Sequence, residues 1–412
     1  MNILFVIDAC GMFGNPKSGG SNRSTLFVKA LTQLGHVDVC SFSDEKVVSD
    51  IKDCDVVYQN QDLRSWRKIG NPLLRGLSSA IRLAFRPHHP NSYYETNEKI
   101  EKIVDDLVRK NKYELIACHW FKTAINCGLL KYKENLVIDV DDDPTNYLKK
   151  IAASFKSSAL KTLYRLKEKG MPYLVKKELE KTFVSFYSNI SEPPSPTSVF
   201  LHNTTICMAN IPNISQDAKN RLLFVGDLCF YPNQYGIKRF VTEIYPLIKS
   251  KVSDVELYIV GKGSQNIQDV VNRVEGVTAL GFVEDISVEY DNTKVVVIPI
   301  YHGSGTAIKF VEAMFMNRPI VSSPIGARGF NVLAKDNEHY LLAKNDEDFA
   351  NKTVELLLDT EKSNTMANKA YELAKDNFSQ DKFMEIVKET IETKLRQKQL
   401  QKINNRELNK VI

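Results

Sequence analysis

Runs of branched apolar residues recur along the chain, and a glycine, a proline or a polar loop follows most of them. The runs are continuous rather than alternating, which is typical of strands buried on both faces of a parallel sheet. The predicted strands are Asn2–Asp8, His36–Phe42, Asp55–Tyr58, Leu115–Cys118, Leu136–Val140, Phe183–Ser188, Arg221–Val225, Val255–Val260, Val277–Leu280, Val295–Ile298, Ile320–Ser323 and Leu341–Ala343. Stretches with helical spacing lie between them. The predicted helices include Ser21–Leu34, Thr96–Lys110, 145–182, 234–248, Ala307–Met316, Asp346–Leu358 and Asn364–Asn377, with Ser21, Thr96 and Asp346 as expected N-caps.

The alternation of strands and helices predicts an α/β protein built from doubly wound, Rossmann-like sheets. The pattern begins at residue 2 and begins again at Arg221–Val225, after a proline-rich break at 192–196. A chain of 412 residues is long enough for two such domains with cores of their own. We therefore predict one domain over 1–205 and a second over 206–379, followed by a helix and a basic tail over 380–412.

Composition and charge are those of an ordinary globular protein, with 43% hydrophobic residues, 25% charged residues and a net charge of +5. The seven cysteines show no CxxC spacing, which is typical of reduced cysteines in a cytoplasmic protein. The first residues lack the basic start and long apolar core of a signal peptide, so we expect a first strand there. No apolar run approaches the roughly 18 residues of a membrane-spanning helix.

Positive charge is concentrated in two segments of the N-terminal half. Residues 63–94 contain no acid, and their apolar residues recur at helical spacing; residues 145–182 are rich in lysine. A basic amphipathic helix fits an anionic membrane surface, and it equally fits a solvated helix packed on the core. Neither segment has the aromatic platform of a nucleic-acid site, so no nucleic-acid partner is expected.

The most informative stretch is 292–329, which reads as strand, glycine loop, helix and second strand. The loop consists of Gly303, Ser304, Gly305 and Thr306. Backbone N–H groups and the dipole of the following helix favour an anion at such a loop, and phosphate is the usual one. Lys309 lies one turn inside the helix and could hold phosphate, while Glu312, about one turn further, could accept hydrogen bonds from sugar hydroxyls. Taken alone, the loop also fits an ordinary strand-to-helix turn.

This stretch resembles the donor site of GT-B glycosyltransferases, especially the retaining family 4. The matching motifs are Glu312-Ala313-Met314, Pro319-Ile320-Val321 and Gly326-Ala327-Arg328-Gly329. The first acid of the family pattern would fall at Ser304, and Gly-Ser-Gly-Thr-x-x-Lys is a variant of that pattern. The resemblance is good over 221–357 and loose before it. It implies two Rossmann-like domains facing across a cleft, with the last helix crossing back to the first domain.

The resemblance also implies which residues of the second domain hold the donor. Gly226 ends its opening strand at the site, and the backbone around Phe282 and Val283 would face the nucleobase. Glu312 would bind the ribose hydroxyls.

One departure from the family concerns the charge that neutralises the donor diphosphate. Many members carry an arginine and a lysine for this purpose, and the matching positions here are Asp227 and Tyr235. Lys309, together with Arg328 or Lys262, would then have to supply the positive charge.

Two features of the first domain lie at the carboxyl ends of strands, where α/β sheets bind ligands. Gly19 and Gly20 precede the first helix; in the resemblance the pair lies in the cleft, and alone it fits a plain turn. His119 ends a strand, where family members often place a histidine against donor or acceptor, although a lone histidine is commonly structural. The acidic run 139–143 fits a polar site wall, a strand-end turn or a metal site, but lacks the pattern of a calcium loop.

These features predict a hexosyltransferase-like enzyme that moves a sugar from a nucleotide diphosphate sugar to a hydroxyl of a glycan or lipid-linked acceptor. The role would be polysaccharide or cell-surface glycan synthesis in the cytoplasm, with peripheral contact at the inner face of the membrane. The resemblance implies retention of configuration and no cofactor or essential metal, with His119, Lys309 and Glu312 as catalytic residues. Two alternatives stay open: a nucleotide-sugar epimerase or hydrolase on the same fold, and a non-catalytic GT-B scaffold.

Overall fold

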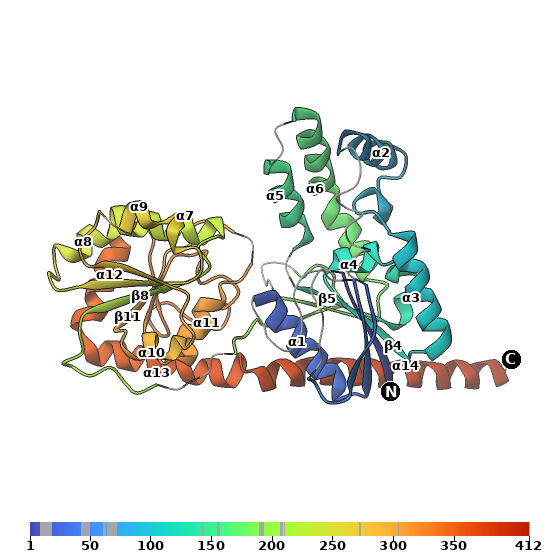
Figure 1. Ribbon diagram of the computed structural model, residues 1–412. Helices are drawn as coiled ribbons and strands as arrows, with labels where there is room; N and C mark the ends of the chain where they lie inside the picture. Colours follow the sequence, from blue (N-terminus) through green and yellow to red (C-terminus); the bar gives the residue numbers. More distant parts are fainter. Residues whose placement is uncertain are drawn as a thin grey trace. The chain divides into compact units, whose positions relative to one another are not determined.

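The computed structural model describes residues 1–8, 19–42, 50–60, 63, 72–141, 143–154, 157–188, 193–206, 209, 211–271, 273–303 and 305–411. It divides into two compact units (Figure 1): Met1–Leu201 with the residues from Phe383 onward, and His202–Lys382. The chain therefore divides after residue 201 rather than 205, and after 382 rather than 379.

The first unit is built on a parallel sheet with the strand order β3-β2-β1-β4-β5-β6-β7. Its strands are β1 (Asn2–Ile7), β2 (His36–Ser41), β3 (Cys54–Gln59), β4 (Leu115–His119), β5 (Leu136–Asp141), β6 (Val184–Tyr187) and β7 (Ser198–Phe200). Its helices are α1 (Gly19–Thr32), α2 (Pro72–Phe85), η2 (Pro90–Ser92), α3 (Glu98–Asn111), α4 (Phe121–Asn126), η3 (Leu129–Asn135), α5 (Pro144–Ser154), α6 (Ser158–Leu179) and most of α14 (Gln380–Val411). The order reverses between β1 and β4, so ligands are expected where those strands end.

Both faces of the first sheet are covered, which explains why its strands are continuously apolar. Along β1, Leu4 and Val6 pack into one core cluster, whereas Ile3 and Phe5 pack into another on the opposite face. Helix α14 contributes residues spaced four apart to the second cluster: Phe383, Val387 and Ile391. This spacing puts the three side chains on one side of the helix.

The second unit repeats the same winding, with the order β10-β9-β8-β11-β12-β13. Its strands are β8 (Arg221–Val225), β9 (Glu256–Val260), β10 (Val277–Gly281), β11 (Val295–Ile298), β12 (Ile320–Ser322) and β13 (Leu341–Leu342). Its helices are α7 (Tyr231–Arg239), η4 (Phe240–Ile244), α8 (Tyr245–Lys249), η5 (Ser264–Asn266), α9 (Gln268–Val271), α10 (Ile286–Asp291), α11 (Ile308–Phe315), α12 (Asp346–Leu358) and α13 (Thr360–Asn377). The order reverses between β8 and β11, which again marks the expected ligand edge.

The structure corrects two predicted N-caps. Asn97 rather than Thr96 caps α3, because its side chain accepts from backbone N–H groups of the first turn. The Thr96 hydroxyl instead donates to the Ile125 carbonyl. Asn345 rather than Asp346 caps α12 in the same way. In both cases the cap is an asparagine one position away from the predicted residue, directly before the first helical residue.

Three predicted helices also have different bounds. Gly19 and Gly20 begin α1 rather than preceding it, so Ser21 is not its N-cap. The helix predicted over 234–248 contains a π-helical segment, η4. Within 63–94 the main helix is α2, and Arg64, Arg67 and Lys68 lie outside the described residues.

Among the described cysteines, four are buried and unbridged, and Cys229 is exposed and unbridged. Over the described part of the chain, no helix has both the length and the hydropathy needed to cross a membrane.

Candidate active site

The predicted glycine loop connects β11 to α11 in the second unit. Gly303 has φ +126°, a conformation that L side chains rarely adopt, so glycine is required there. Ser304 lies outside the described residues. The helix begins after Ala307 with no side-chain cap, so its first N–H groups are available to an anion.

Two contacts from outside the loop hold its second half. The Arg328 guanidinium donates to the Gly305 carbonyl at 2.7 Å. The Asn203 side-chain amide donates to the Thr306 hydroxyl oxygen at 2.6 Å. Arg328 therefore places its charge beside the loop, as the sequence suggested, while bonding the loop backbone.

Lys309 reaches from the first turn of α11 to the end of β8. Its ammonium lies 4.3 Å from the centre of the Phe224 ring. A Cβ added at Gly226 would lie 2.6 Å from Nζ, so glycine leaves the space that the lysine occupies. Burial lowers the pKa of Lys309 to about 7, against the opposing effect of the Glu312 charge.

Asn233 orients Lys309, and the sequence analysis missed it. The lysine Nζ donates to Asn233 Oδ1 at 2.7 Å. The other end of the same amide donates to the Asp227 carbonyl at 2.9 Å, which fixes the direction of the oxygen. The partner of the lysine is thus a neutral amide, and no ion pair to Lys309 occurs among the described residues. Lys309 therefore offers a positive charge that no carboxylate neutralises directly.

Glu312 lies one turn along α11 and is held by two hydroxyl groups. Tyr290 donates to Oε1 at 2.8 Å and Thr205 to Oε2 at 3.4 Å. Burial raises the pKa of Glu312, and the Tyr290 bond and the Lys309 charge oppose this rise. A carboxylate oxygen can accept more than one hydrogen bond, which the predicted role with sugar hydroxyls requires.

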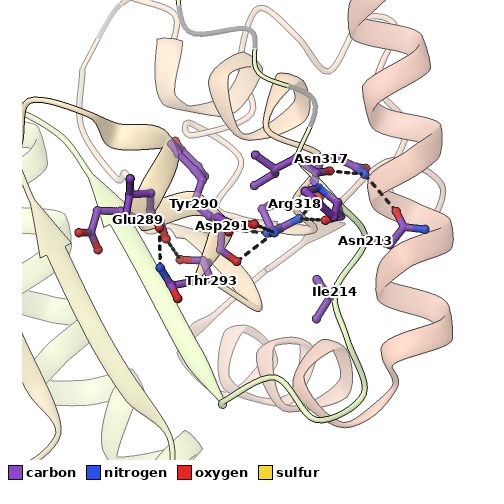
Figure 2. A network of polar contacts seen from close by, with 12 residues as sticks. Asn213, Ile214, Glu289, Tyr290, Asp291, Thr293, Asn317 and Arg318 are labelled. Atoms are coloured by element: carbon purple, nitrogen blue, oxygen red, sulfur yellow. Dashed lines mark hydrogen bonds and ion pairs between the residues drawn. The ribbon is translucent and has the colours of Figure 1, made fainter.

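The buried Arg318 holds the end of α10, the helix that carries Tyr290 (Figure 2). Its guanidinium donates to the carbonyls of Tyr290 and Asp291 and to the carbonyl of Pro212 in the preceding linker. Asn317, next to it, donates to the side chain of Asn213 in the same linker. Arg318 therefore holds the backbone of the residue whose hydroxyl positions Glu312.

The predicted nucleobase segment follows β10. Phe282 is 67% exposed, and the Lys262 ammonium lies 5.5 Å from the centre of its ring. Val283 is partly buried against the core of the unit. Phe282 thus presents an aromatic surface on which a base could stack, and Lys262 is engaged with that ring rather than with the glycine loop.

At the two positions where cations were expected, the structure places a turn and an aromatic group. Asp227 accepts from the Cys229 backbone through its carboxylate. Tyr235 packs against Tyr231, Tyr301 and His302. Neither residue replaces the missing charge, so Lys309 and Arg328 are the cations that the structure describes at this loop and the helix after it.

His119 belongs to the first unit, at the end of β4. It is buried, and its Nδ1 lies 2.9 Å from Asp139 Oδ2. Arg23 of α1 makes two bonds to the same carboxylate, at 2.7 and 2.8 Å. Burial raises the pKa of Asp139, but Arg23 and His119 outweigh it and bring the value to about 2. The carboxylate therefore favours the tautomer that donates from Nδ1, and the buried Nε2 has no hydrogen-bond partner among the described residues.

The remaining site predictions in the first unit concern its glycines and acids. Gly19 and Gly20 form the start of α1. Arg23, one turn further along the same helix, was not predicted from the sequence. Asp139 faces Arg23 and His119, and Asp143 accepts from the backbone of Thr145 at the start of α5. In the described residues no group of three or more metal-ligating side chains gathers.

The candidate donor site lies in a stretch of sequence that matches a known family. Residues 219–359, which contain the glycine loop, Lys309 and Glu312, match the family model described as Glycosyl transferases group 1. The second unit contains a group 1 glycosyltransferase domain. The chain is also 21% identical, over 90% of its length and 95% of the relative's, to an uncharacterized 44.6 kDa protein in the cps region of Klebsiella pneumoniae.

Solved structures show the fold of the whole chain. Anabaena HepE in complex with UDP and glucose is 15% identical with a TM-score of 0.59, covering 95% of this chain and all of HepE. Sucrose-phosphate synthase from Thermosynechococcus elongatus is 16% identical with a TM-score of 0.63, and both chains are covered completely. The predicted GT-B fold of this glycosyltransferase is confirmed by its two parallel sheets and these neighbours.

Proposed function

We propose that this glycosyltransferase moves a sugar from a nucleoside diphosphate sugar to a hydroxyl acceptor, with retention of configuration and without a metal ion. The observation that carries the proposal is the position of Lys309, a half-buried side chain in the first turn after the glycine loop whose ammonium donates to an amide oxygen. A structural neighbour was solved in complex with UDP-glucose, which supports a nucleotide sugar as the donor.

The chemistry follows from where negative charge develops. When the sugar leaves the donor, the diphosphate gains charge, and preorganised donors at that point lower the barrier. The uncapped start of α11 and Lys309 are such donors, because both are directed toward one edge of the sheet. Glu312 would fix the ribose, so that binding energy from the nucleoside orients the reacting bond.

On the acceptor side, the proposal assigns His119 to the sugar or the acceptor hydroxyl. Asp139 holds its Nδ1, and Arg23 holds Asp139, so the ring is fixed with Nε2 as the remaining polar atom. Gly19 and Gly20, at the start of α1, would let a ligand approach the backbone closely. This assignment rests on the buried Nε2, which otherwise lacks a partner in the described structure.

The acceptor in this proposal is a glycan or a lipid-linked glycan, and the product is a polysaccharide or cell-surface glycan. The relative in the Klebsiella pneumoniae cps region supports this role. Transfer would take place in the cytoplasm, with the enzyme peripherally bound at the inner face of the membrane.

The test is a panel of nucleoside diphosphate sugars, screened first by thermal shift because a bound ligand raises stability by mass action. Donors that bind are then assayed for transfer with Lys309→Ala, Glu312→Ala and the wild type. We expect both variants to fold and to lose most of the transfer activity. Wild-type activity in either variant would contradict the assignment, and turnover of the donor without any acceptor would favour an epimerase or hydrolase.

A further inference from the structure

Helix α2 carries exposed apolar side chains in addition to those that pack against the first unit. Leu83 lies against the core, and Ser79 is buried. Leu77, Ile81 and Phe85 follow one another at four-residue spacing on another side, and they are 60%, 50% and 83% exposed. Several exposed apolar side chains in a row along one side of a helix mark a surface that has a further partner.

Helix α6 extends the same surface. Leu166 and Tyr173, seven residues apart and therefore on one side of the helix, are both exposed. The His88 ring, just beyond α2, lies 4.6 Å from the Tyr173 ring, and Lys177 donates to the His88 carbonyl. Figure 1 shows α2 and α6 next to each other at the top of the first unit. The five side chains Leu77, Ile81, Phe85, Leu166 and Tyr173 are called the apolar surface below.

The frame beneath the apolar surface is well held. The buried Lys167 of α6 donates to the Tyr93 carbonyl, and the Tyr93 hydroxyl donates to the Pro87 carbonyl just after α2. A Cβ at Gly170 would lie 2.0 Å from that hydroxyl, so the glycine lets α6 approach Tyr93 closely. The two helices therefore present their exposed apolar side chains from a fixed base.

Basic side chains surround the apolar surface. Arg86, Lys169 and Lys176 are exposed on the same two segments. A hollow of about 490 Å³ adjoins them, and its lining includes His88, His89, Lys131, Lys133, Lys177 and Lys181. Its two acids are engaged, since Glu178 pairs with Lys133 and Glu101 with Lys131. The electrostatic character of this region is thus positive.

We propose that the apolar surface docks on a bilayer that contains anionic phospholipids. The apolar side chains enter the interface, and the surrounding lysines and arginines contact lipid phosphates. A bilayer fits better than a folded partner because the apolar side chains stand on two helices within a basic surround, and long basic side chains reach headgroups readily. The inference gives the proposed membrane location a specific surface, but lipid binding does not depend on sugar transfer.

The test is co-flotation of the full chain with vesicles of phosphatidylcholine alone or with 30 mol% phosphatidylglycerol. We expect binding to the anionic vesicles that weakens at least tenfold between 0.1 and 0.5 M salt, and little binding to the neutral ones. The double variant Ile81→Ser/Phe85→Ser should lower partitioning at least tenfold. The matched control is Leu358→Ser/Ile403→Ser, two exposed apolar residues elsewhere, which should stay within twofold of the wild type.

Lys169→Glu/Lys176→Glu tests the charged surround separately and should also weaken anionic binding at least tenfold. Absence of binding to anionic vesicles, or equal losses in the double variant and its control, would overturn the proposal. Self-association without lipid that Ile81→Ser/Phe85→Ser abolishes would identify a second copy as the occupant instead. Vesicle binding without transfer to any acceptor would leave this surface intact and contradict only the proposed function.

Discussion

The two units share one winding order but treat buried charge in opposite ways. In the first, the Asp139 carboxylate pairs with the Arg23 guanidinium and accepts a hydrogen bond from the His119 ring. In the second, the half-buried Lys309 places its ammonium against a neutral amide and an aromatic ring. A charge that is neutralised within the fold stabilises local geometry. A charge without a direct counter-ion lowers the free energy of unfolding, and it is typical of a site that binds an anion.

The largest expected effect is on stability, and it comes from removing the carboxylate that Arg23 and His119 share. Asp139→Ala removes the carboxylate that takes two bonds from the buried Arg23 and leaves the longer contact to Asp141 at 3.4 Å. Breaking a buried ion pair in this way typically costs about 3–5 kcal/mol of unfolding free energy. Urea titration of the full chain, fitted with a separate transition for the first unit, measures this loss. Lys309→Met should change the stability of the second unit by less than about 1 kcal/mol, since it removes a desolvated charge. If both variants lost the same free energy of unfolding, the proposed difference between the two units would be wrong.

The next effect concerns catalysis. Lys309→Ala should lower kcat/KM by roughly 10²–10³, the usual loss when one group that stabilises developing negative charge is removed. Asn233→Ala, which frees the lysine, should reduce the rate by a smaller factor. Lys309→Arg should restore little, because the Asn233 amide and Gly226 shape the space for an ammonium. Steady-state rates with saturating acceptor provide the measurement, and full rescue by arginine would argue that only charge matters.

A third prediction concerns the pH dependence of donor affinity, which tests whether the charge of Lys309 binds the donor. Burial lowers the pKa of Lys309 to about 7, so below pH 7 the free protein already carries the charge. Above pH 7, binding of an anionic donor must take up a proton, and donor affinity should fall by up to about tenfold per pH unit. Calorimetry between pH 6.5 and 8.5, in buffers of different ionisation enthalpy, detects both the fall and the proton uptake. The Lys309→Met variant should bind weakly and show a flat profile, and a flat profile in the wild type would contradict the prediction.

The smallest expected effect lies behind Glu312. Tyr290→Phe removes the hydrogen bond to Oε1 and should weaken donor binding by about 1 kcal/mol, or roughly fivefold, with little change in kcat. A 2′-deoxyribose donor supplies the control, because the loss should shrink once a ribose hydroxyl is missing. If both donors lose affinity equally, Tyr290 supports the fold rather than the orientation of Glu312.

The sequence predicted most strands and the donor loop because those signals are local. Continuous apolar runs identified strands such as β1 and β11. The short spacing between Lys309 and Glu312 predicted that both residues lie near the start of the same helix. The partners of these residues could not be read in the same way. Asn233 lies 76 residues from Lys309, and Arg23 lies 116 residues from Asp139. Such pairs exist only once the sheet order brings strand ends together, and the sequence carries no spacing rule for them.

Helix ends were the other weak point, for a different reason. At Thr96 and Asn97, as at Asn345 and Asp346, adjacent residues can both cap a helix, and the choice depends on where else each side chain can bond. Thr96 is drawn away by the Ile125 carbonyl. Gly19 and Gly20 form the first turn of α1. Glycine is tolerated there because the rest of the helix packs against the core. Propensity alone does not decide such competitions.

The linker that leads into the second unit is bonded to the donor site at several points. Asn203 and Thr205 bond Thr306 and Glu312, while Pro212 and Asn213 bond Arg318 and Asn317. Energetic coupling is reciprocal. If a ligand binds more tightly when these bonds are formed, the same ligand stabilises the bonds by an equal free energy. We therefore expect substitutions at Asn203 or Asn213 to change donor affinity without touching the ligand.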